Sequence, residues 1–451
     1  MIKEKKNKIK ICFLHYGIGW KDGVNSVITS FAESIQTAGK QAEVCFLAGE
    51  IKKRIKKRFL SWEIKELLPK KEEFSKSKEY FLEKGEIIAK KISEIVVDND
   101  IKKVIIENPL MGDYHLAAML GFLFFTQKYK PEGVEVFFRV HDFFLDEEKY
   151  YKHFNKIFSP EERKKLFRSK GINRIFIINK NLKNKLRKIG FPQNKIYYLP
   201  NGLEIKRFGQ KPGKSKLKKI KKNLGFSQKD KILLYPVRIV SRKNIEEAIL
   251  LTYFIRLLTG SNYVLFVPGE VDKRDPLTED YFQNLKKLKE VVNFRIVFGK
   301  RIKASIFTLY NLAEAVIITS IKEGFGLPFL ECWAAKKVII GRRIKIISDF
   351  EEKGLVFNWL YKSFFLNGYE LSKIGEERFS KRISLICKVF EDKRFEKKVL
   401  KMNQKAIESQ VDLLKNKEKR EEIIKKNFLA VKKNYDIGKI RDKFLKLINL
   451  H

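Results

Sequence analysis

Short apolar runs alternate with amphipathic segments along most of the chain, and this alternation predicts strands and helices in turn. In the first half, apolar runs rich in β-branched and aromatic residues fall at 10–14, 42–47, 103–107, 134–140, 174–178 and 195–199. Amphipathic helices are predicted between them, for example at 24–38 and 81–97. Strands that are apolar throughout are typical of a parallel sheet covered on both faces. The first half is therefore predicted to be a doubly wound α/β domain.

The alternation stops at the turn residues Pro200-Asn201-Gly202 and a lysine-rich stretch, and then starts again. The second series has apolar runs at 232–237, 263–267, 294–298, 315–320 and 337–341, with helices predicted at 245–258, 306–312 and 328–335. From about 376 the chain is charged and helical. We predict Rossmann-like domains at 1–208 and 224–430, a basic linker at 209–223, and a C-terminal helix at 431–451 that packs back toward the first domain. Because ligands of such sheets bind beyond the carboxyl ends of the strands, the two domains are expected to face each other across a cleft.

The chain is strongly basic. Its 451 residues include 96 Lys and Arg against 54 Asp and Glu, a formal net charge of +42. Nucleic acid, an anionic membrane surface or a lysine-rich composition could each explain this charge. The excess is spread along the chain, and its densest runs, 52–58 and 214–222, are interpreted as solvated segments or, alternatively, as interfacial helices. We therefore favour composition, place a peripheral association with an anionic membrane second, and expect no nucleic-acid partner because no recognition module is evident.

Cysteine and histidine positions give no metal-binding pattern. The four cysteines are scattered without a C-x-x-C pair, and the five histidines do not cluster. Asp98-Asn99-Asp100 has the D-x-D form associated with metal-bound sugar nucleotides, but it lies between a helix and the next strand and is interpreted as a turn. No metal and no cofactor are expected. The chain is expected to be cytoplasmic, or peripheral to the inner face of the membrane, because its thiols suit a reducing compartment and its most apolar stretch, 116–125, is too short to span a bilayer.

The most informative motif is Glu323-Gly-Phe-Gly-Leu-Pro-Phe-Leu-Glu331, directly after a predicted strand. Gly324 and Gly326 allow backbone amides to approach a ligand closely. Pro328 suits the first turn of a helix, and the positive end of a helix attracts phosphate or sugar oxygens. Glu323 from the loop and Glu331 from the helix can each accept hydrogen bonds from hydroxyl groups. The motif predicts a sugar-nucleotide site, and the alternative is an ordinary strand–loop–helix connection.

Two cations follow the first strand of the second domain. Arg238 can hold two oxygens of one phosphate with its guanidinium, and Lys243 can supply a point charge to the next phosphate. Both could instead be surface cations of a basic protein. Their position at the carboxyl end of a strand favours a diphosphate site.

Polar residues also follow strands of the first domain. His141 can hydrogen-bond a substrate hydroxyl or carry a proton, and the alternative is a structural histidine. Glu107 and Asn108 end a neighbouring strand and are candidate acceptor contacts. The glycine-rich stretch 17–23 lacks the G-x-G-x-x-G spacing of a dinucleotide site, but Gly23 is a candidate for close approach to an acceptor or a phosphate.

Together these residues resemble the GT-B glycosyltransferases of family 4, retaining enzymes that use nucleotide sugars. The likeness runs from about residue 8 to about residue 350, and it is carried by the Glu323-x7-Glu331 motif, by Arg238 and Lys243, by Leu199-Pro-Asn-Gly202 followed by Phe208, by His141 and by Gly23. The resemblance implies a GT-B fold, a UDP- or GDP-sugar donor, a small-molecule or lipid-linked hydroxyl acceptor, front-face attack with retention, and no metal.

The resemblance also implies a role for each matching residue. Arg238 and Lys243 would bind the donor diphosphate, and Glu331 would bind the ribose. The transferred sugar would be held by Glu323 and by the backbone of Gly324, Phe325, Gly326 and Leu327. His141 would touch that sugar from the opposite domain. Glu323 and His141 are therefore the catalytic candidates.

Two features depart from the family pattern. Arg342 and Arg343 stand where small residues are usual, and they are candidate contacts to a phosphorylated or carboxylated acceptor, or else surface residues. The donor loop reads Ser241-Arg-Lys-Asn244 instead of ending in Lys-Gly. Its Pro-Val-Arg and Arg-Lys-Asn sequences are similar to those of family members that build glycosylglycerates. Two other classes stay open: a sugar-nucleotide epimerase of the same architecture, and a nucleic-acid-binding protein suggested by the charge alone.

Overall fold

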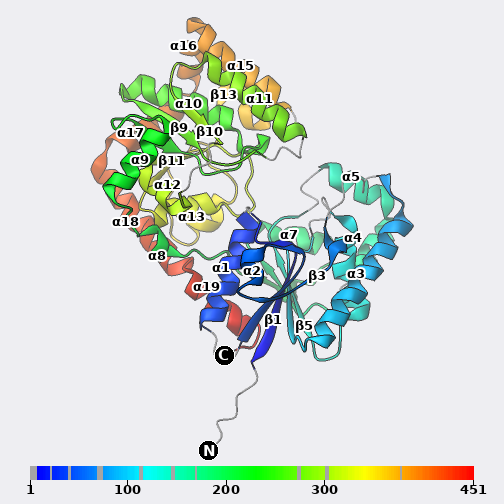
Figure 1. Ribbon diagram of the computed structural model, residues 1–451. Helices are drawn as coiled ribbons and strands as arrows, with labels where there is room; N and C mark the ends of the chain where they lie inside the picture. Colours follow the sequence, from blue (N-terminus) through cyan, green and yellow to red (C-terminus); the bar gives the residue numbers. More distant parts are fainter. Residues whose placement is uncertain are drawn as a thin grey trace, which may run out of the picture. The chain divides into compact units, whose positions relative to one another are not determined.

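The computed structural model describes residues 8–20, 23–38, 42–68, 75–110, 115–143, 148–167, 170–271, 276–299, 304–375 and 378–450. The chain divides into two compact units. Unit 1 comprises Met1–Gly202 and Ile437–His451, and unit 2 comprises Leu203–Asp436. Each unit contains a parallel sheet with helices packed on it (Figure 1). The predicted pair of doubly wound α/β domains is therefore confirmed.

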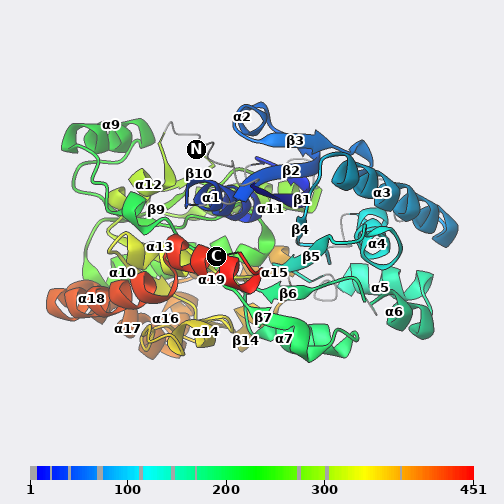
Figure 2. The same cartoon turned by 90° about the horizontal axis from the view of Figure 1, so that it is seen from below.

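Unit 1 is built on a seven-stranded parallel sheet with the order β3-β2-β1-β4-β5-β6-β7. Its strands are β1 (Ile9–Ile18), β2 (Ala42–Ile51), β3 (Leu60–Glu63), β4 (Lys103–Glu107), β5 (Glu135–Val140), β6 (Arg174–Ile177) and β7 (Ile196–Tyr198). Its α-helices are α1 (Gly23–Ala38), α2 (Lys53–Lys56), α3 (Lys78–Asp98), α4 (Leu116–Phe124), α5 (Glu148–Ile157), α6 (Pro160–Leu166), α7 (Asn181–Lys188) and α19 (Ile437–Leu447). Helices α3 and α4 pack together on one face of the sheet, and α1 and α19 on the other (Figures 1 and 2).

The C-terminal helix α19 belongs to unit 1 because its apolar face completes the core there. The ring of Phe444 is fully buried and lies 5.1 Å from the ring of Phe31 and 5.5 Å from that of Phe176, centroid to centroid. Ile440 and Ile448 join the same cluster. Aromatic contacts of this kind stabilise a core beyond the area they bury, so the last helix is an integral part of the first unit.

Unit 2 has a five-stranded parallel sheet with the order β10-β9-β8-β11-β12. Its strands are β8 (Lys231–Leu234), β9 (Tyr263–Val267), β10 (Ile296–Phe298), β11 (Ala315–Ile318) and β12 (Val338–Gly341), with a separate hairpin of β13 (Phe365–Leu366) and β14 (Tyr369–Glu370). Its α-helices are α8 (Ile205–Phe208), α9 (Lys214–Leu224), α10 (Ile245–Thr259), α11 (Pro276–Val291), α12 (Ile306–Leu312), α13 (Leu327–Ala334), α14 (Ile347–Glu351), α15 (Phe379–Glu391), α16 (Lys393–Met402), α17 (Gln404–Lys415) and α18 (Lys417–Asn434). Helix α10 packs against α15 and α17, and α13 against α18.

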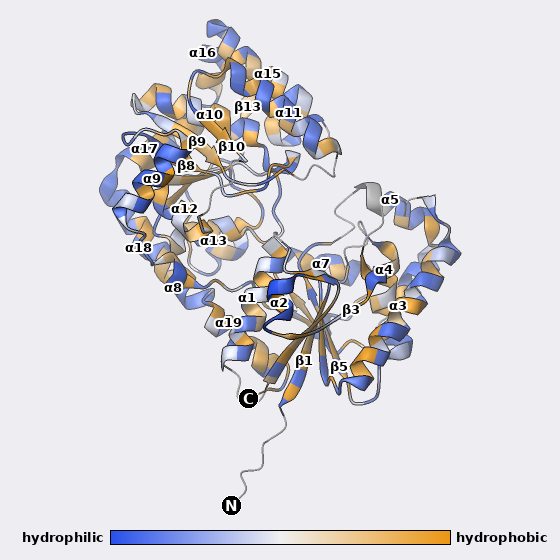
Figure 3. Ribbon diagram, in the orientation of Figure 1, coloured by the Kyte–Doolittle hydropathy of each residue, from blue (hydrophilic) through white to orange (hydrophobic). Residues whose placement is uncertain are grey.

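Hydropathy follows this layering. The central strands of both sheets are hydrophobic, whereas most outer helices carry one apolar and one polar side (Figure 3). Strand β4 is buried along its whole length, and so are β9 and β11. Such runs of apolar residues suit strands that are covered on both faces. None of the helices in the described part of the chain combines the length and apolarity needed to cross a bilayer.

The structure and the sequence-based expectations differ in several boundaries. The division between the units falls after Gly202, not after 208, and helix α9 of unit 2 occupies most of the stretch expected as a linker. Helix α9 forms because Ile220 and Leu224 are buried on one side while the lysines stay exposed. Strand β3 is absent from the sequence-based expectation, because its four residues at the edge of the sheet form no apolar run. The turn predicted at Asp98-Asn99-Asp100 is present, since α3 ends at Asp98 and Asp100 has φ 51°.

Candidate functional site

The candidate site of unit 2 lies where the strand order of its sheet reverses. Strand β8 comes first along the chain and lies between β9, the second strand, and β11, the fourth. Ligands of doubly wound sheets bind at such a switch point, beyond the carboxyl ends of the strands. Arg238 and Lys243 follow β8, and Glu323 follows β11. The predicted donor residues therefore come from the two strands that flank the switch point.

Lys243 and Glu323 form a buried ion pair. The Lys243 Nζ donates to both carboxylate oxygens of Glu323, at 2.5 and 2.6 Å, and the Ser320 hydroxyl donates to Oε1 at 2.6 Å. Burial lowers the pKa of Lys243 to about 8, although Glu323 opposes this shift. Burial alone would raise the pKa of Glu323, but Lys243 and the nearby Arg242 outweigh it, so that this pKa is lowered. At neutral pH both groups are charged, and each orients the other.

Arg238 is the exposed cation of this edge. Within the described part of the chain, no hydrogen bond or ion pair to its guanidinium is found, and its charge contributes to the lowered pKa of Lys243. Arg242 differs, because it donates to the Lys322 carbonyl at 3.2 Å and lies 3.8 Å from Glu323. An accessible guanidinium beside a buried ammonium is suited to bind the oxygens of a phosphate.

Helix α13 starts with a geometry that requires glycine. Gly326 is the residue before the helix and has φ 77°, a left-handed conformation that other residues avoid. A Cβ atom at this position would lie 3.0 Å from the Phe329 ring. A proline occupies the first turn, as predicted, and Phe325 is buried while Leu327 is partly exposed. The loop therefore enters the helix in one fixed conformation, with the positive end of the helix dipole at its start.

Glu331 lies one turn inside α13 and is held by a tyrosine. The Tyr310 hydroxyl, on α12, donates to Glu331 Oε2 at 2.7 Å. No partner of the other oxygen, Oε1, is found among the described residues. Burial raises the pKa of Glu331 to about 7, and the hydrogen bond from Tyr310 opposes this rise. Glu331 thus has one fixed oxygen and one available to accept a hydrogen bond, and it changes charge near neutral pH.

Two buried glutamates in the first turn of α10 support the loop that carries Lys243. Glu247 accepts from Arg342 Nη2 at 2.6 Å and from the Tyr361 hydroxyl at 2.7 Å. Glu246 accepts from Arg382 Nε at 2.5 Å. The sequence analysis did not identify these buried glutamates or their arginine and tyrosine partners. Two adjacent acidic residues at the start of an apolar helix were the available signal, but nothing in the pattern identifies their distant partners.

Arg342, a candidate acceptor contact, is buried and already has partners within unit 2. Its guanidinium is 2% exposed and is occupied by Glu247 and by the Lys362 carbonyl, which it reaches at 3.1 Å. A buried carboxylate needs such a partner, and Arg342 supplies it. Arg343 is partly exposed, and its guanidinium donates to both oxygens of Glu351. An acceptor would have to compete with that carboxylate for Arg343.

In unit 1, His141 directly follows β5 and is almost completely buried. Its Nε2 lies 2.6 Å from Glu107 Oε2, and Glu107 Oε1 lies 3.3 Å from the guanidinium of Arg139. Burial tends to raise the pKa of Glu107, but Arg139 and His141 lower it overall. The Asn108 side chain accepts from the backbone N–H groups of His141 and Asp142, at 3.3 and 2.9 Å. Glu107 and Asn108 are both buried and orient His141.

The glycine-rich stretch of unit 1 meets the start of α1. Gly23 is the first residue of α1 and is exposed, and a Cβ atom built there would meet no atom within 4 Å. Packing therefore does not require glycine at this position. Asn25 Oδ1 accepts from the Gly19 N–H at 2.8 Å and fixes the preceding turn.

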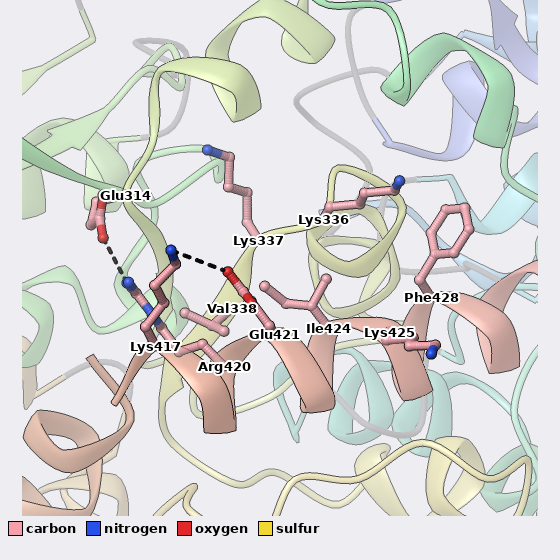
Figure 4. Close-up of a pocket in the computed structure, with 10 residues that line it drawn as sticks. All are labelled: Glu314, Lys336, Lys337, Val338, Lys417, Arg420, Glu421, Ile424, Lys425 and Phe428. Carbon is pink, nitrogen blue, oxygen red and sulfur yellow. Dashed lines mark hydrogen bonds and ion pairs between the residues drawn. The ribbon is translucent and has the colours of Figure 1, made fainter. Parts of the chain in front are cut away.

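A separate pocket of about 480 Å³ lies at the opposite, amino-terminal edge of the unit 2 sheet (Figure 4). It is lined by Glu314, Lys336, Lys337, Val338, Lys417, Arg420, Glu421, Ile424, Lys425 and Phe428. Arg420 pairs with Glu314 at 2.6 Å, and Lys417 with Glu421 at 3.8 Å. Because Glu314 and Val338 precede or begin β11 and β12, this pocket is separate from the loops that carry Lys243 and Glu323. The described residues contain no group of three or more His, Cys, Asp or Glu side chains placed to hold a metal ion.

Residues 217–360 match the family model described as glycosyl transferases group 1, so unit 2 contains a domain of that family. Two similar curated proteins come from Petrotoga mobilis. Mannosylglucosyl-3-phosphoglycerate synthase is 30% identical over 214 residues, which cover 45% of this chain and 40% of the relative. Mannosylglucosylglycerate synthase is 27% identical over 272 residues, which cover 53% of this chain and 59% of the relative. The chain therefore matches only about half the length of these relatives.

Similar solved structures match almost the whole chain in fold. A glycosyltransferase from Rickettsia africae has a TM-score of 0.62 at 15% identity and covers 98% of both chains. Anabaena HepE, solved in complex with UDP and glucose, has a TM-score of 0.63 at 12% identity and covers 98% of this chain and 99% of that one. At these identities the likeness concerns the fold, which is of the GT-B type.

Proposed function

We propose that the protein is a retaining hexosyltransferase that moves a sugar from UDP or GDP to a hydroxyl group of an acceptor. The observation that carries this proposal is the arrangement at the unit 2 switch point. An exposed arginine, a buried Lys–Glu pair and a glycine-hinged helix start follow adjacent strands, within a domain of the glycosyl transferases group 1 family.

Each group of the site has a place in this reaction. Arg238 and Lys243 bind the donor diphosphate and neutralise the charge that develops on it as the glycosidic bond breaks. Glu331 accepts hydrogen bonds from the ribose hydroxyls through its second oxygen. Glu323, held by Lys243 and Ser320, orients the transferred sugar together with the backbone of 324–327. Positioning and charge stabilisation supply the catalysis, and no metal is needed for either.

Unit 1 carries the acceptor chemistry in this proposal. His141 is its catalytic candidate, because Glu107 and Asn108 fix the ring through Nε2 and the backbone. A fixed imidazole can hydrogen-bond a sugar hydroxyl or take up a proton. We propose Gly23 and Arg343 as the remaining acceptor contacts, since both are at least partly exposed.

We propose a small acceptor that carries a negative charge. Two curated relatives are synthases whose names contain glycerate or 3-phosphoglycerate, and the chain has a net charge of +42, which attracts anionic substrates. A lipid-linked acceptor, reached through peripheral attachment to an anionic membrane, is the alternative within the same reaction. Vesicle sedimentation with and without anionic lipid separates these two versions.

The proposal is tested by analysing the products formed from a nucleotide sugar labelled in its hexose. The full chain is incubated with labelled UDP- and GDP-hexoses and with glycerate or 3-phosphoglycerate, and the products are separated by chromatography that resolves isomeric sugars and are then identified by mass. We expect label in a glycoside whose mass is the sum of acceptor and hexose minus water, together with free UDP or GDP. Label that remains in an isomeric nucleotide sugar would contradict transfer and indicate an epimerase.

A further inference from the structure

Arg382 is a fully buried arginine that reaches the loop of the donor site from a distant part of the chain. It lies in α15, beyond the residues 217–360 that match the family model. Its Nη2 donates to the Ser241 carbonyl at 3.1 Å, and its Nη1 donates to the carbonyls of Ile374 and Gly375 at 3.0 and 2.8 Å. Its Nε donates to Glu246 at 2.5 Å. One side chain thus joins α15, the preceding turn and the loop that carries Lys243.

Glu246 links Arg382 to the first residue of α10 through a chain of hydrogen bonds. It also accepts a hydrogen bond from the Tyr281 hydroxyl at 2.5 Å, and the same oxygen of Tyr281 accepts from the Ile245 N–H at 2.9 Å. Ile245 is the first residue of α10, whose opening N–H groups have no partner within the helix. The arginine, the glutamate and the tyrosine therefore fix the point at which the donor loop becomes a helix.

The backbone at this point is strained and needs such support. Asn244 has φ 52° and ψ 50° although it is not glycine, a conformation that persists only where the surroundings enforce it. Its side chain donates to Glu247 at 2.7 Å and to the Thr319 carbonyl at 3.2 Å. Lys243 directly precedes this residue. Any relaxation of the turn would therefore move the ammonium group.

We propose that Arg382 is a positioning residue of the donor site: it holds the Ser241–Asn244 turn so that Lys243 meets the donor diphosphate. This inference rests on the proposed function and adds to it a residue outside the family-matched segment. Arg382 makes no contact with the ligand itself. Its effect passes through the Ser241 carbonyl and through Glu246.

An arginine suits this position better than a lysine. The guanidinium donates in several fixed directions at once, and here it serves a carboxylate and three carbonyls. A lysine could keep a positive charge near Glu246, but a single ammonium could not reach all the carbonyls. A methionine would leave Glu246 buried without a cation and the Ser241 carbonyl without its donor, and both losses destabilise the turn.

The test measures binding of UDP and GDP, and of uridine and guanosine, to the full chain by calorimetry. Arg382→Met and Arg382→Lys are compared with wild type and with a control, Arg420→Met. Arg420 also forms a 2.6 Å ion pair in unit 2, with Glu314 at the amino-terminal edge of the sheet (Figure 4). The nucleosides lack the diphosphate, so they report on structural damage that does not involve Lys243.

We expect Arg382→Met to weaken binding of the nucleoside diphosphate by about tenfold or more, because misplacing a charged group by about 1 Å has effects of that size. Arg382→Lys should fall between Arg382→Met and wild type. Arg420→Met should stay within twofold of wild type, and nucleoside binding should be unchanged in all three. Diphosphate binding within twofold of wild type in both Arg382 variants would overturn the inference.

Two further outcomes are decided by the same data. If Arg382→Met does not unfold cooperatively, Arg382→Lys decides: selective loss of diphosphate binding supports positioning, and equal loss for diphosphate and nucleoside overturns it. Failure of the wild type to bind either diphosphate would instead refute the proposed function, and this inference with it. That result is distinguishable because it involves no variant.

Discussion

At the scale of single residues, two groups of the donor site have opposite requirements for charge. In the proposed reaction, Glu331 is ionised when it accepts hydrogen bonds from the ribose hydroxyls, whereas Lys243 is protonated when it attracts a phosphate. Burial moves both groups toward neutral pH, since it raises the pKa of Glu331 to about 7 and lowers that of Lys243 to about 8. The donor site is therefore fully charged only within a narrow range of pH.

We predict a bell-shaped dependence of kcat/KM for the donor on pH. Below about 7, Glu331 is protonated and loses an acceptor, so kcat/KM falls as the pH decreases. Above about 8, Lys243 loses its charge, so kcat/KM falls as the pH increases. Steady-state rates at limiting donor concentration measure this profile, which reports on the free enzyme. A flat profile between pH 6 and 9, a range set about one unit outside the two values, would contradict these assignments.

Removing the hydroxyl group of Tyr310 tests whether the acid limb of the pH profile is due to Glu331. Tyr310→Phe removes the hydrogen bond that lowers the pKa of Glu331, so the acid limb should move to higher pH while the alkaline limb stays in place. Tyr263→Phe is the matched control, because Tyr263 begins β9 at the opposite edge of the sheet. The assignment to Glu331 fails if both variants give the wild-type profile.

Individual residues also show what a sequence can and cannot reveal. Glu323 and Lys243 were predictable because each follows a recognisable strand in a recognisable motif, and the structure joins them at 2.5 Å. Arg342 follows a strand and Glu107 ends one, and both are buried in ion pairs as well, with Glu247 and Arg139. The sequence could not show any of these pairings, because each partner lies far away along the chain.

At the scale of elements, two glycine variants can distinguish an effect of the start of α13 on ligand binding from an effect on overall stability. Gly326→Ala forces a left-handed conformation on a residue with a Cβ atom and also presses that atom against Phe329. Gly354 has φ 88°, but a Cβ atom added there would meet no atom within 4 Å, so Gly354→Ala introduces the conformational cost alone. That cost is about 1–2 kcal/mol.

We predict that both glycine variants lower the free energy of unfolding, as measured by urea titration. Only Gly326→Ala should also weaken binding of the nucleoside diphosphate, by about tenfold, because the start of α13 belongs to the proposed donor site. Equal diphosphate affinities in the two variants would show that the conformation at the start of α13 does not matter for binding.

The elements themselves were largely predictable. Fully buried strands such as 103–107 and 263–267 are predicted at the correct residues, because burial on both faces leaves a run of apolar residues in each. Strand β3 escapes prediction because an edge strand is half exposed and its composition is mixed. Helix α9 resembles a linker in sequence because its lysines outnumber the two residues, Ile220 and Leu224, that hold it to unit 2.

At the scale of the whole molecule, the division into two units depends on contacts between distant segments. Helix α19 returns to unit 1 through Phe444, and α15 supports the donor loop through Arg382. Both contacts join segments that lie far apart in the sequence. The second could not be expected, because Arg382 and Glu246 are 136 positions apart and neither is unusual in its local sequence.

The net charge of +42 belongs to the molecule as a whole and not to one site. The described ion pairs of unit 1 include lysines on α2, α3 and β4, and those of unit 2 include lysines on α16 and α18. Apart from the buried Lys103, these lysines are at least partly exposed, and exposed pairs contribute little to stability. A charge distributed in this way fits a lysine-rich composition, with a general attraction for anionic substrates as its consequence.

The most direct test of the account is a calorimetric titration of UDP and GDP into wild type and into Arg238→Ala. Arg238 is exposed and has no partner among the described residues, so its removal should leave the unfolding temperature unchanged. We predict saturable binding of at least one diphosphate to wild type, and affinity at least about tenfold weaker in the variant because a charged phosphate contact is lost. Absence of binding to wild type, or equal affinity in the two proteins, would contradict the claim that this edge of unit 2 binds a nucleotide-activated sugar.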